Sequence, residues 1–136
     1  MPRIHPIAGL AALMLALSPA RAEEPAAVVD PQIEGPARCA AVYTFFSVFI
    51  GKENPAAKQA LTDAAVRLLE HASDIPRGNE PLVRERFKAN NDALLAALTD
   101  STTGKAAREA LGEELKTCGD TEKQIFGSSV RERINR

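Results

Sequence analysis

The sequence lacks tryptophan altogether, and only six of its 136 residues are aromatic, one tyrosine and five phenylalanines. His5 and His71 are its two histidines, and its two methionines, Met1 and Met14, both lie near the N-terminus. His5 lies in the N-terminal segment that is expected to be removed, so a catalytic triad would depend on His71. No Cys-x-x-Cys-His or Glu-x-x-His pattern is present to hold haem or a pair of metal ions. We expect no cofactor, no metal site and no enzymatic activity.

The chain also lacks an excess of charge and a long hydrophobic run. Its 17 lysines and arginines nearly balance its 18 aspartates and glutamates, so no basic surface for nucleic acid is indicated. The uncharged stretch at residues 39–51 falls well short of the roughly 20 residues that a transmembrane helix needs. We therefore expect no nucleic-acid partner and, once the N-terminal segment is removed, no membrane span.

Residues 1–22 have the features of a secretory signal peptide. Arg3 supplies the positive start, residues 7–17 are apolar, and Ala20 and Ala22 occupy the small positions before a cleavage site. Cleavage after Ala22 would leave 15 basic and 18 acidic residues, a net charge of −3. The bacterial style of this signal predicts an exported protein, located in the periplasm.

Proline and glycine divide the rest of the chain. Residues 23–36 hold three prolines and a glycine but few large apolar groups, which predicts a flexible lead-in. Apolar residues then recur at three- and four-residue steps in four segments, as in helices that bury one face. The first predicted helix covers residues 37–50, and the second begins at Pro55 and ends before Pro76. The third begins at about Glu80 and ends at the break at 101–104. The fourth begins after this break and ends at Gly119.

Residues 120–136 are predicted to form an amphipathic C-terminal segment. Thr121 to Gln124 have the spacing of a capping box, and Phe126, Val130 and Ile134 then recur every four residues. The glycine and two serines at 127–129 weaken this pattern, so we expect a short helix that frays.

Cys39 and Cys118 are the only cysteines of the chain. In an exported protein, two cysteines are expected to form one disulfide. They lie at the start of the first predicted helix and at the end of the fourth, and these points meet at the same end of an up-down-up-down bundle. The sequence therefore predicts an all-α fold, an up-down-up-down four-helix bundle over residues 37–119 with a short C-terminal helical extension and one disulfide.

Ala41, Phe45 and Val48 form a second apolar face on the first predicted helix, beside a core stripe that includes Tyr43 and Phe49. A helix that is apolar nearly all round must be covered on both sides. The covering could be the C-terminal segment folding back, a second copy in a homodimer, or a protein partner or apolar ligand. The leading hypothesis is a non-enzymatic interaction or accessory role through this face.

Asn90, Asn91 and Glu114 flank the apolar stripes of the third and fourth predicted helices. Residues at such positions are usually edge residues or specify helix register. An alternative hypothesis places them in a polar pocket between these two helices, where they would orient a small ligand for binding or weak catalysis.

A third hypothesis comes from a resemblance. In size, helicity and cysteine count the chain is similar to small exported helical proteins with one disulfide that act as acid-stress chaperones of the periplasm. Cys39 and Cys118 lie farther apart than the resemblance implies, and no motif is shared. The resemblance implies a protein that dissociates in acid.

Overall fold

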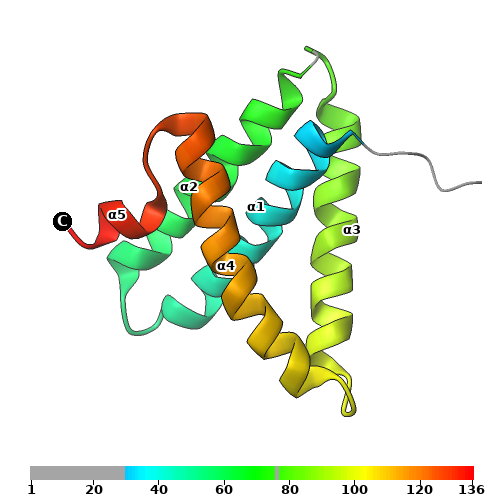
Figure 1. Cartoon of the computed structure of the whole chain (residues 1–136), viewed down its shortest axis with the longest axis vertical. Helices are drawn as coiled ribbons and strands as arrows, with labels where there is room; N and C mark the ends of the chain where they lie inside the picture. The colour runs from blue at the N-terminus through cyan, green and yellow to red at the C-terminus, as the bar shows by residue number, and fades with distance from the viewer. Residues whose placement is uncertain (1–29, 76) are drawn as a thin grey trace, which may run out of the picture.

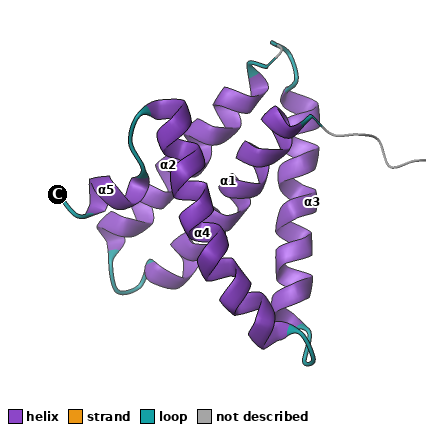
Figure 2. Cartoon of the chain, in the orientation of Figure 1, coloured by secondary structure: helices purple, strands orange, loops and turns teal. Residues whose placement is uncertain are grey.

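The computed structural model describes residues 30–75 and 77–136. The expected signal peptide at residues 1–22, and residues 23–29 of the expected lead-in, lie outside this part of the chain. Regular structure in the described residues is helical (Figure 2). The one exception is an isolated bridge between Asp74 and Arg77. The helices are α1 (Pro31–Ile50), α2 (Pro55–Ser73), α3 (Glu80–Thr99), α4 (Gly104–Phe126) and α5 (Val130–Ile134).

Helix α1 begins at Pro31, earlier than the predicted start at Ala37. The carboxylate of Asp30 caps the helix by accepting a hydrogen bond from the N–H of Gln32 at 2.9 Å. Pro31 occupies the first turn, where its missing N–H costs little. Residues 31–36 are therefore helical, and the prediction that they belong to a lead-in is wrong.

Burial explains why this early turn forms in spite of Pro36, which lies inside the helix. Ile33 is only 2% exposed and packs with Ala72 of α2 and Val83 of α3 in a small second core. Burying an isoleucine stabilises the fold by about 1.5–3 kcal/mol, which is comparable to the cost of about 3 kcal/mol for a proline in a helix interior.

Helices α2 and α3 begin where their sequence signals predicted. Asn54 caps α2 by accepting a hydrogen bond from the N–H of Ala57 at 3.0 Å, and Pro55 is the first helical residue. Helix α3 begins at Glu80. All six residues of the predicted α2 core stripe are buried, namely Ala57, Leu61, Ala64, Ala65, Leu68 and Ala72.

Helix α4 continues through Gly119, its predicted last residue, as far as Phe126. A glycine inside a helix costs only about 1 kcal/mol of stability. Cys118 and Glu122, on either side of Gly119, are bonded to Cys39 and Tyr43 of α1, and these bonds outweigh that cost. Gly127, with a positive φ of 85°, is the actual left-handed stop. The capping box predicted at 121–124 is therefore wrong, and the capping box of the structure joins Ser129 and Glu132 at the start of α5.

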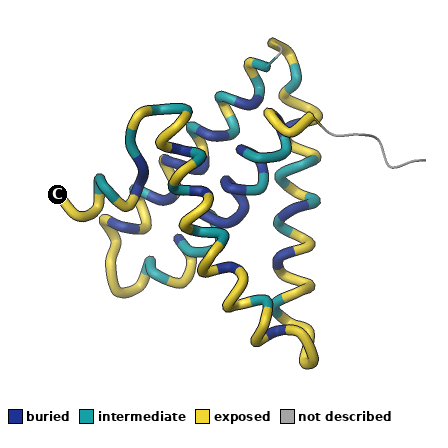
Figure 3. The backbone as a smooth tube through the Cα atoms, viewed as in Figure 1, coloured by how far each residue is buried: buried dark blue, intermediate teal, exposed yellow. Residues whose placement is uncertain are grey.

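Helix α1 lies at the centre of the bundle and contacts α2, α3 and α4 (Figure 1). Consecutive helices from α1 to α4 run in opposite directions, α4 crosses α1, and α5 turns back against α2. Buried residues are concentrated on α1 and α2 (Figure 3). The prediction of an all-α bundle with a short C-terminal helical extension and one disulfide is confirmed.

Candidate functional site

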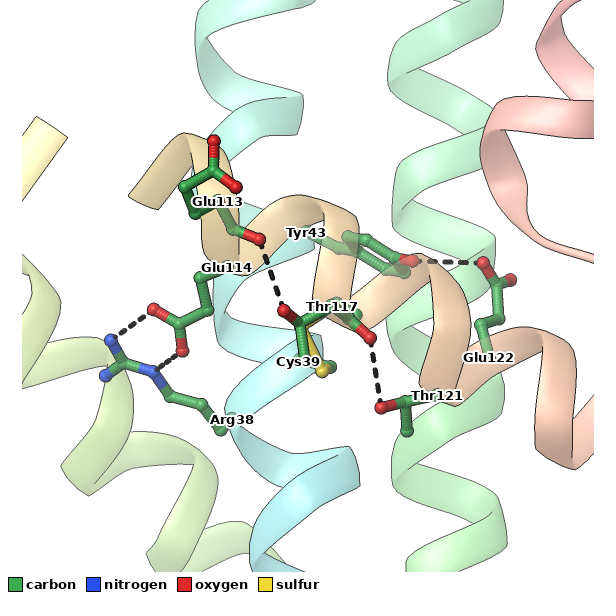
Figure 4. Close-up of a disulfide and its surroundings, with 9 residues drawn as sticks. Arg38, Cys39, Tyr43, Glu113, Glu114, Thr117, Thr121 and Glu122 are labelled. Carbon is green, nitrogen blue, oxygen red and sulfur yellow. Dashed lines mark hydrogen bonds and ion pairs between the residues drawn. A yellow bond between two sulfur atoms is a disulfide. The ribbon is translucent and has the colours of Figure 1, made fainter. Parts of the chain in front are cut away.

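A disulfide and an ion pair lie side by side where α4 crosses α1 (Figure 4). Cys39 and Cys118 form the predicted bond, with their Cα atoms 5.3 Å apart. One turn before Cys118, the carboxylate of Glu114 accepts two hydrogen bonds from the guanidinium of Arg38, one of them 2.8 Å long. The cysteines lie within their helices and not at the helix ends, because α1 and α4 both extend beyond their predicted limits.

Glu122, one turn after Cys118, is fully buried with both carboxylate oxygens bonded. Oε1 accepts hydrogen bonds from the hydroxyl of Tyr43 at 3.0 Å and from the N–H of Val130 at 2.6 Å. Oε2 accepts one from Nη2 of Arg133, also at 2.6 Å. This single carboxylate joins α4 to both α1 and α5, so it fixes the C-terminal helix on the bundle.

The phenol of Tyr43 acts as a hydrogen-bond donor in this network. Its burial raises the pKa of Tyr43, and the negative charge of Glu122 acts in the same direction. A phenol kept protonated in this way donates to the carboxylate and does not serve as a base. The contact of Tyr43 with Glu122 therefore holds helices together.

The importance of Glu122 was missed at the level of sequence, although a signal was present. Leu111, Leu115, Cys118 and Glu122 follow one another at four- and three-residue steps, so a carboxylate occupies the next position of an apolar stripe. A charge buried at such a position needs a partner. The partner, Arg133, could not be identified because only the folding back of α5 brings it close.

Four charged side chains form a ladder from α3 through α1 to α4, which we call the charge ladder: Arg86, Glu34, Arg38 and Glu114. Glu34 accepts hydrogen bonds from Nε and Nη2 of Arg86 at 2.7 and 3.2 Å. Glu34 and Arg38 lie one turn apart on α1 and attract each other. Hydrogen bonds from Arg86 and Asn90 hold the pKa of Glu34 below its usual value, and the bond to Glu114 raises the pKa of Arg38.

The three residues of the predicted polar pocket lie beside or within this ladder. The amide of buried Asn90 donates hydrogen bonds to Oε1 of Glu34 and to the carbonyl of Arg86, both at 2.8 Å. Glu114 is bonded to Arg38, and Asn91 is half-buried on α3. None of the three lines either of the two cavities described below.

The predicted second face of α1 is covered in one part and open in another. Ala41 is fully buried, Phe45 is half-buried against the core, and Val48 is 66% exposed. Glu34 and Arg38 lie on this same face, at helical spacing from Ala41, and they bind α3 and α4. These two helices therefore cover the N-terminal half of the face.

The last turn of α1 is more exposed than its pattern indicated. Phe49 was expected in the core stripe but is 67% exposed, with its ring centroid 4.7 Å from that of Phe45. Because α4 crosses α1 and does not run along it, this turn extends beyond the crossing (Figure 1).

The C-terminal segment contacts α2 and α4. The ring of Phe126 lies 4.2 Å from the guanidinium of Arg67 and packs edge-on against His71. Helix α5 then closes one side of a groove of about 580 Å³ between α1, α2 and α4, which we call the α5 groove. Its apolar lining residues are Tyr43, Phe46, Ile50, Leu61, Leu115, Val130 and Ile134.

Charged side chains surround the apolar floor of the α5 groove. Lys116, Asp120 and Lys123 come from α4, and Arg131 and Glu132 come from α5. Nζ of Lys123 and Oε1 of Glu132 form an ion pair of 2.8 Å, which joins the two helices at the rim. An apolar floor with a charged rim suits a molecule that has an apolar body and a polar end.

No group of three or more histidines, cysteines or acidic residues that could hold a metal ion occurs in residues 30–75 and 77–136. No helix in the same part of the chain combines the length and the hydropathy needed to cross a bilayer. No family model, curated protein or solved structure matches this chain. Its function must therefore be inferred from its own residues.

Proposed function

We propose that this chain is an exported, non-enzymatic binding protein that holds the apolar part of a small amphiphilic molecule in the α5 groove. The observation that carries the proposal is the combination of an apolar floor and a charged rim in one cavity of about 580 Å³. Small-molecule sites have volumes of roughly 300–1,000 Å³ and mostly apolar walls with a few polar groups.

The exported, periplasmic location is part of this proposal. It is supported by the disulfide between Cys39 and Cys118, because such bonds form and persist in oxidising compartments. The signal-like pattern of residues 1–22 favours the bacterial periplasm.

A binding role is favoured over catalysis because the buried polar groups at the groove are already bonded to one another. Glu122 is saturated by Tyr43, Val130 and Arg133. An acid–base or nucleophilic mechanism needs such groups to be directed at a substrate. Here they hold the walls of the groove in place.

The groove can be blocked at Gly112, which lines it from α4. A Cβ added at this glycine would meet no atom within 4 Å, so there is open space where a larger side chain would begin. We expect Gly112→Phe to weaken binding of a neutral apolar dye, N-phenyl-1-naphthylamine, by about tenfold or more, a loss of about 1.4 kcal/mol. Fluorescence titration of the dye measures this change.

Two variants provide matched controls. Gly112→Ala should leave dye binding unchanged while it stabilises α4 by about 1 kcal/mol, because alanine is the better helix former. Gly35→Phe places the same ring at another helical glycine with open space around it, outside the groove. Dye binding by Gly112→Phe equal to that of wild type, or no dye binding by wild type, would contradict the proposal.

The open end of α1 supports a second candidate function, which is docking of a protein partner or of a second copy. Val48 and Phe49 are 66% and 67% exposed and adjacent in sequence, and Phe45 lies behind them. Exposed apolar groups that lie together often mark an interaction site.

The homodimer form of this candidate predicts a concentration-dependent dimer that the double variant Val48→Ser/Phe49→Ser abolishes. Sedimentation velocity at pH 7 and at pH 3 tests this form and the acid-stress chaperone hypothesis together, because dissociation in acid is the property the resemblance implies. Wild-type protein that sediments as a monomer at both pH values excludes the homodimer and the chaperone hypothesis.

A further inference from the structure

A second groove, on a different face, is independent of the α5 groove and of the function proposed for it. It lies between α2 and α3 and has a volume of about 470 Å³; we call it the α2–α3 groove. Its floor consists of Val66 and Leu69 from α2 and Val83 and Phe87 from α3. Val66 is 47% exposed, so part of this apolar floor faces solvent.

The shape of the α2–α3 groove follows from helix spacing. On α2 the lining residues are Val66, Leu69, Glu70 and Ser73, at steps of three and four, followed by the C-cap residue Asp74. They form one face that extends for about 12 Å at 1.5 Å per residue. This length equals about two turns of a helix, so a third helix could lie along α2 and α3 as a further member of the bundle.

The charges that border this groove are mostly negative. Glu70, Asp74 and Glu80 are acidic, and Arg84 is the only basic residue among the described residues of the lining. None of the three carboxylates forms an ion pair within residues 30–75 and 77–136. Glu34 and Asp92, by contrast, form ion pairs with Arg86 and Lys88 of α3. An external partner could therefore supply the cationic groups that these carboxylates lack in the described part of the chain.

We propose that the α2–α3 groove docks a helical segment of a partner protein that carries apolar side chains on one face and lysine or arginine on its flanks. The apolar face would cover Val66, Leu69 and Phe87, and the basic flanks would lie near Glu70, Asp74 and Glu80. Amphipathic helices bind apolar grooves through side chains at i, i+3, i+4 and i+7. Complementary charge adds specificity and speeds association.

A second copy of this chain is a poorer occupant. Its basic C-terminal segment, with Arg131, Arg133 and Arg136, has apolar residues Val130 and Ile134 at the required spacing. Val130 is buried in the core, however, and Arg133 is bonded to buried Glu122. This segment cannot dock on another copy without leaving its own bundle.

The proposal is tested with three synthetic peptides on the full mature chain. The first has leucine at i, i+3, i+4 and i+7 with lysine on both flanks, the second has glutamate in place of lysine, and the third is a scramble of the first that spreads its leucines round the helix. Calorimetric titration should detect binding of the first peptide only, with an affinity that falls as salt is added. Methyl NMR shifts at Val66 and Val83 should report the same titration.

Charge reversal supplies the specificity control. Glu70→Lys/Asp74→Lys should weaken binding of the lysine peptide by about tenfold or more. Glu53→Lys/Glu109→Lys changes the net charge equally at two exposed positions outside the groove and should leave binding unchanged. Glu70→Gln/Asp74→Asn removes the charge without adding repulsion and serves if the reversal disturbs the fold.

Four results would overturn the proposal: no binding of the lysine peptide, equal binding of the glutamate or scrambled peptide, an equal loss in both charge-reversal variants, or NMR shifts confined to another face. Self-association of the chain that protects Val66 would also overturn it, because the occupant would then be a second copy.

Discussion

Replacing Cys39 and Cys118 together by alanine is expected to lower the free energy of unfolding by up to about 4 kcal/mol. The bond joins residues 79 apart in sequence, so its loss frees a long loop in the unfolded chain. Helix α4 should lose most stability, because the disulfide is its covalent link to α1 and few of its other residues are buried, namely Gly104, Leu111 and Glu122. Chemical denaturation measures the total loss, and hydrogen exchange shows whether α4 and α5 lose protection before α2.

Reduction of the wild-type protein is the matched control for this variant. It breaks the same bond without removing the sulfur atoms, so any excess loss in the alanine variant reports the cavity left in the core. A loss within about 0.5 kcal/mol, the range of neutral surface substitutions, would show that the bond constrains the unfolded chain little. Equal protection of α2 and α4 would show that the bond does not act mainly on α4.

Glu122→Ala is the second substitution with a large expected effect, a loss of about 3–5 kcal/mol. It leaves three donors without the acceptor they had, namely the hydroxyl of Tyr43, the N–H of Val130 and Nη2 of Arg133. Helix α5 should detach with them, and the α5 groove should lose one wall. Denaturation curves measure the loss, and a fall in dye binding reports the damaged groove.

Two further variants distinguish the loss of the Glu122 hydrogen bonds from a general effect of removing a glutamate. Glu113→Ala removes an exposed carboxylate that pairs with Lys116 on the same helix, and it should cost at most about 0.5 kcal/mol. Adding Tyr43→Phe to Glu122→Ala removes one unsatisfied donor, so the double variant should be less destabilised than the sum of the two single variants. Additive losses would show that Tyr43 and Glu122 are not coupled.

The helices of this protein were largely predictable where local signals agree. Asn54 and Pro55 specify the start of α2 by capping chemistry that needs no other part of the chain. The alanine and leucine stripe of α2 lies at helical spacing and is entirely buried. These predictions succeeded because each depended on neighbours within one or two turns.

The predicted ends of α1 and α4 failed because distant contacts outweighed local signals. Pro31 and Pro36 indicated a lead-in, but burial of Ile33 against α2 and α3 makes that turn helical. Gly119 indicated a stop, but the bonds of Cys118 and Glu122 to α1 carry the helix onward. In both places long-range contacts formed on folding offset a cost of a few kcal/mol in helix propensity.

The candidate sites were less predictable than the fold. The excess of apolar residues on α1 was visible in the sequence, but its explanation was not, because α1 is the central helix and α2, α3 and α4 cover it. Neither groove appeared in the sequence patterns. Each is lined by residues from more than one helix. The walls of the α5 groove include Gly112, which no pattern singled out, and Gly119, whose pattern indicated a helix stop and not a groove.

The sequence by itself determined the helical content, the cap of α2, the disulfide partners and most of the buried stripes, since periodicity, capping and a single pair of cysteines are local or countable properties. Only the tertiary structure decided which helix lies at the centre, where α1 begins and α4 ends, and which charges meet. Those outcomes depend on which surfaces bury one another and on whether a charge such as Glu122 finds a partner when it leaves water, and both are properties of the packed chain.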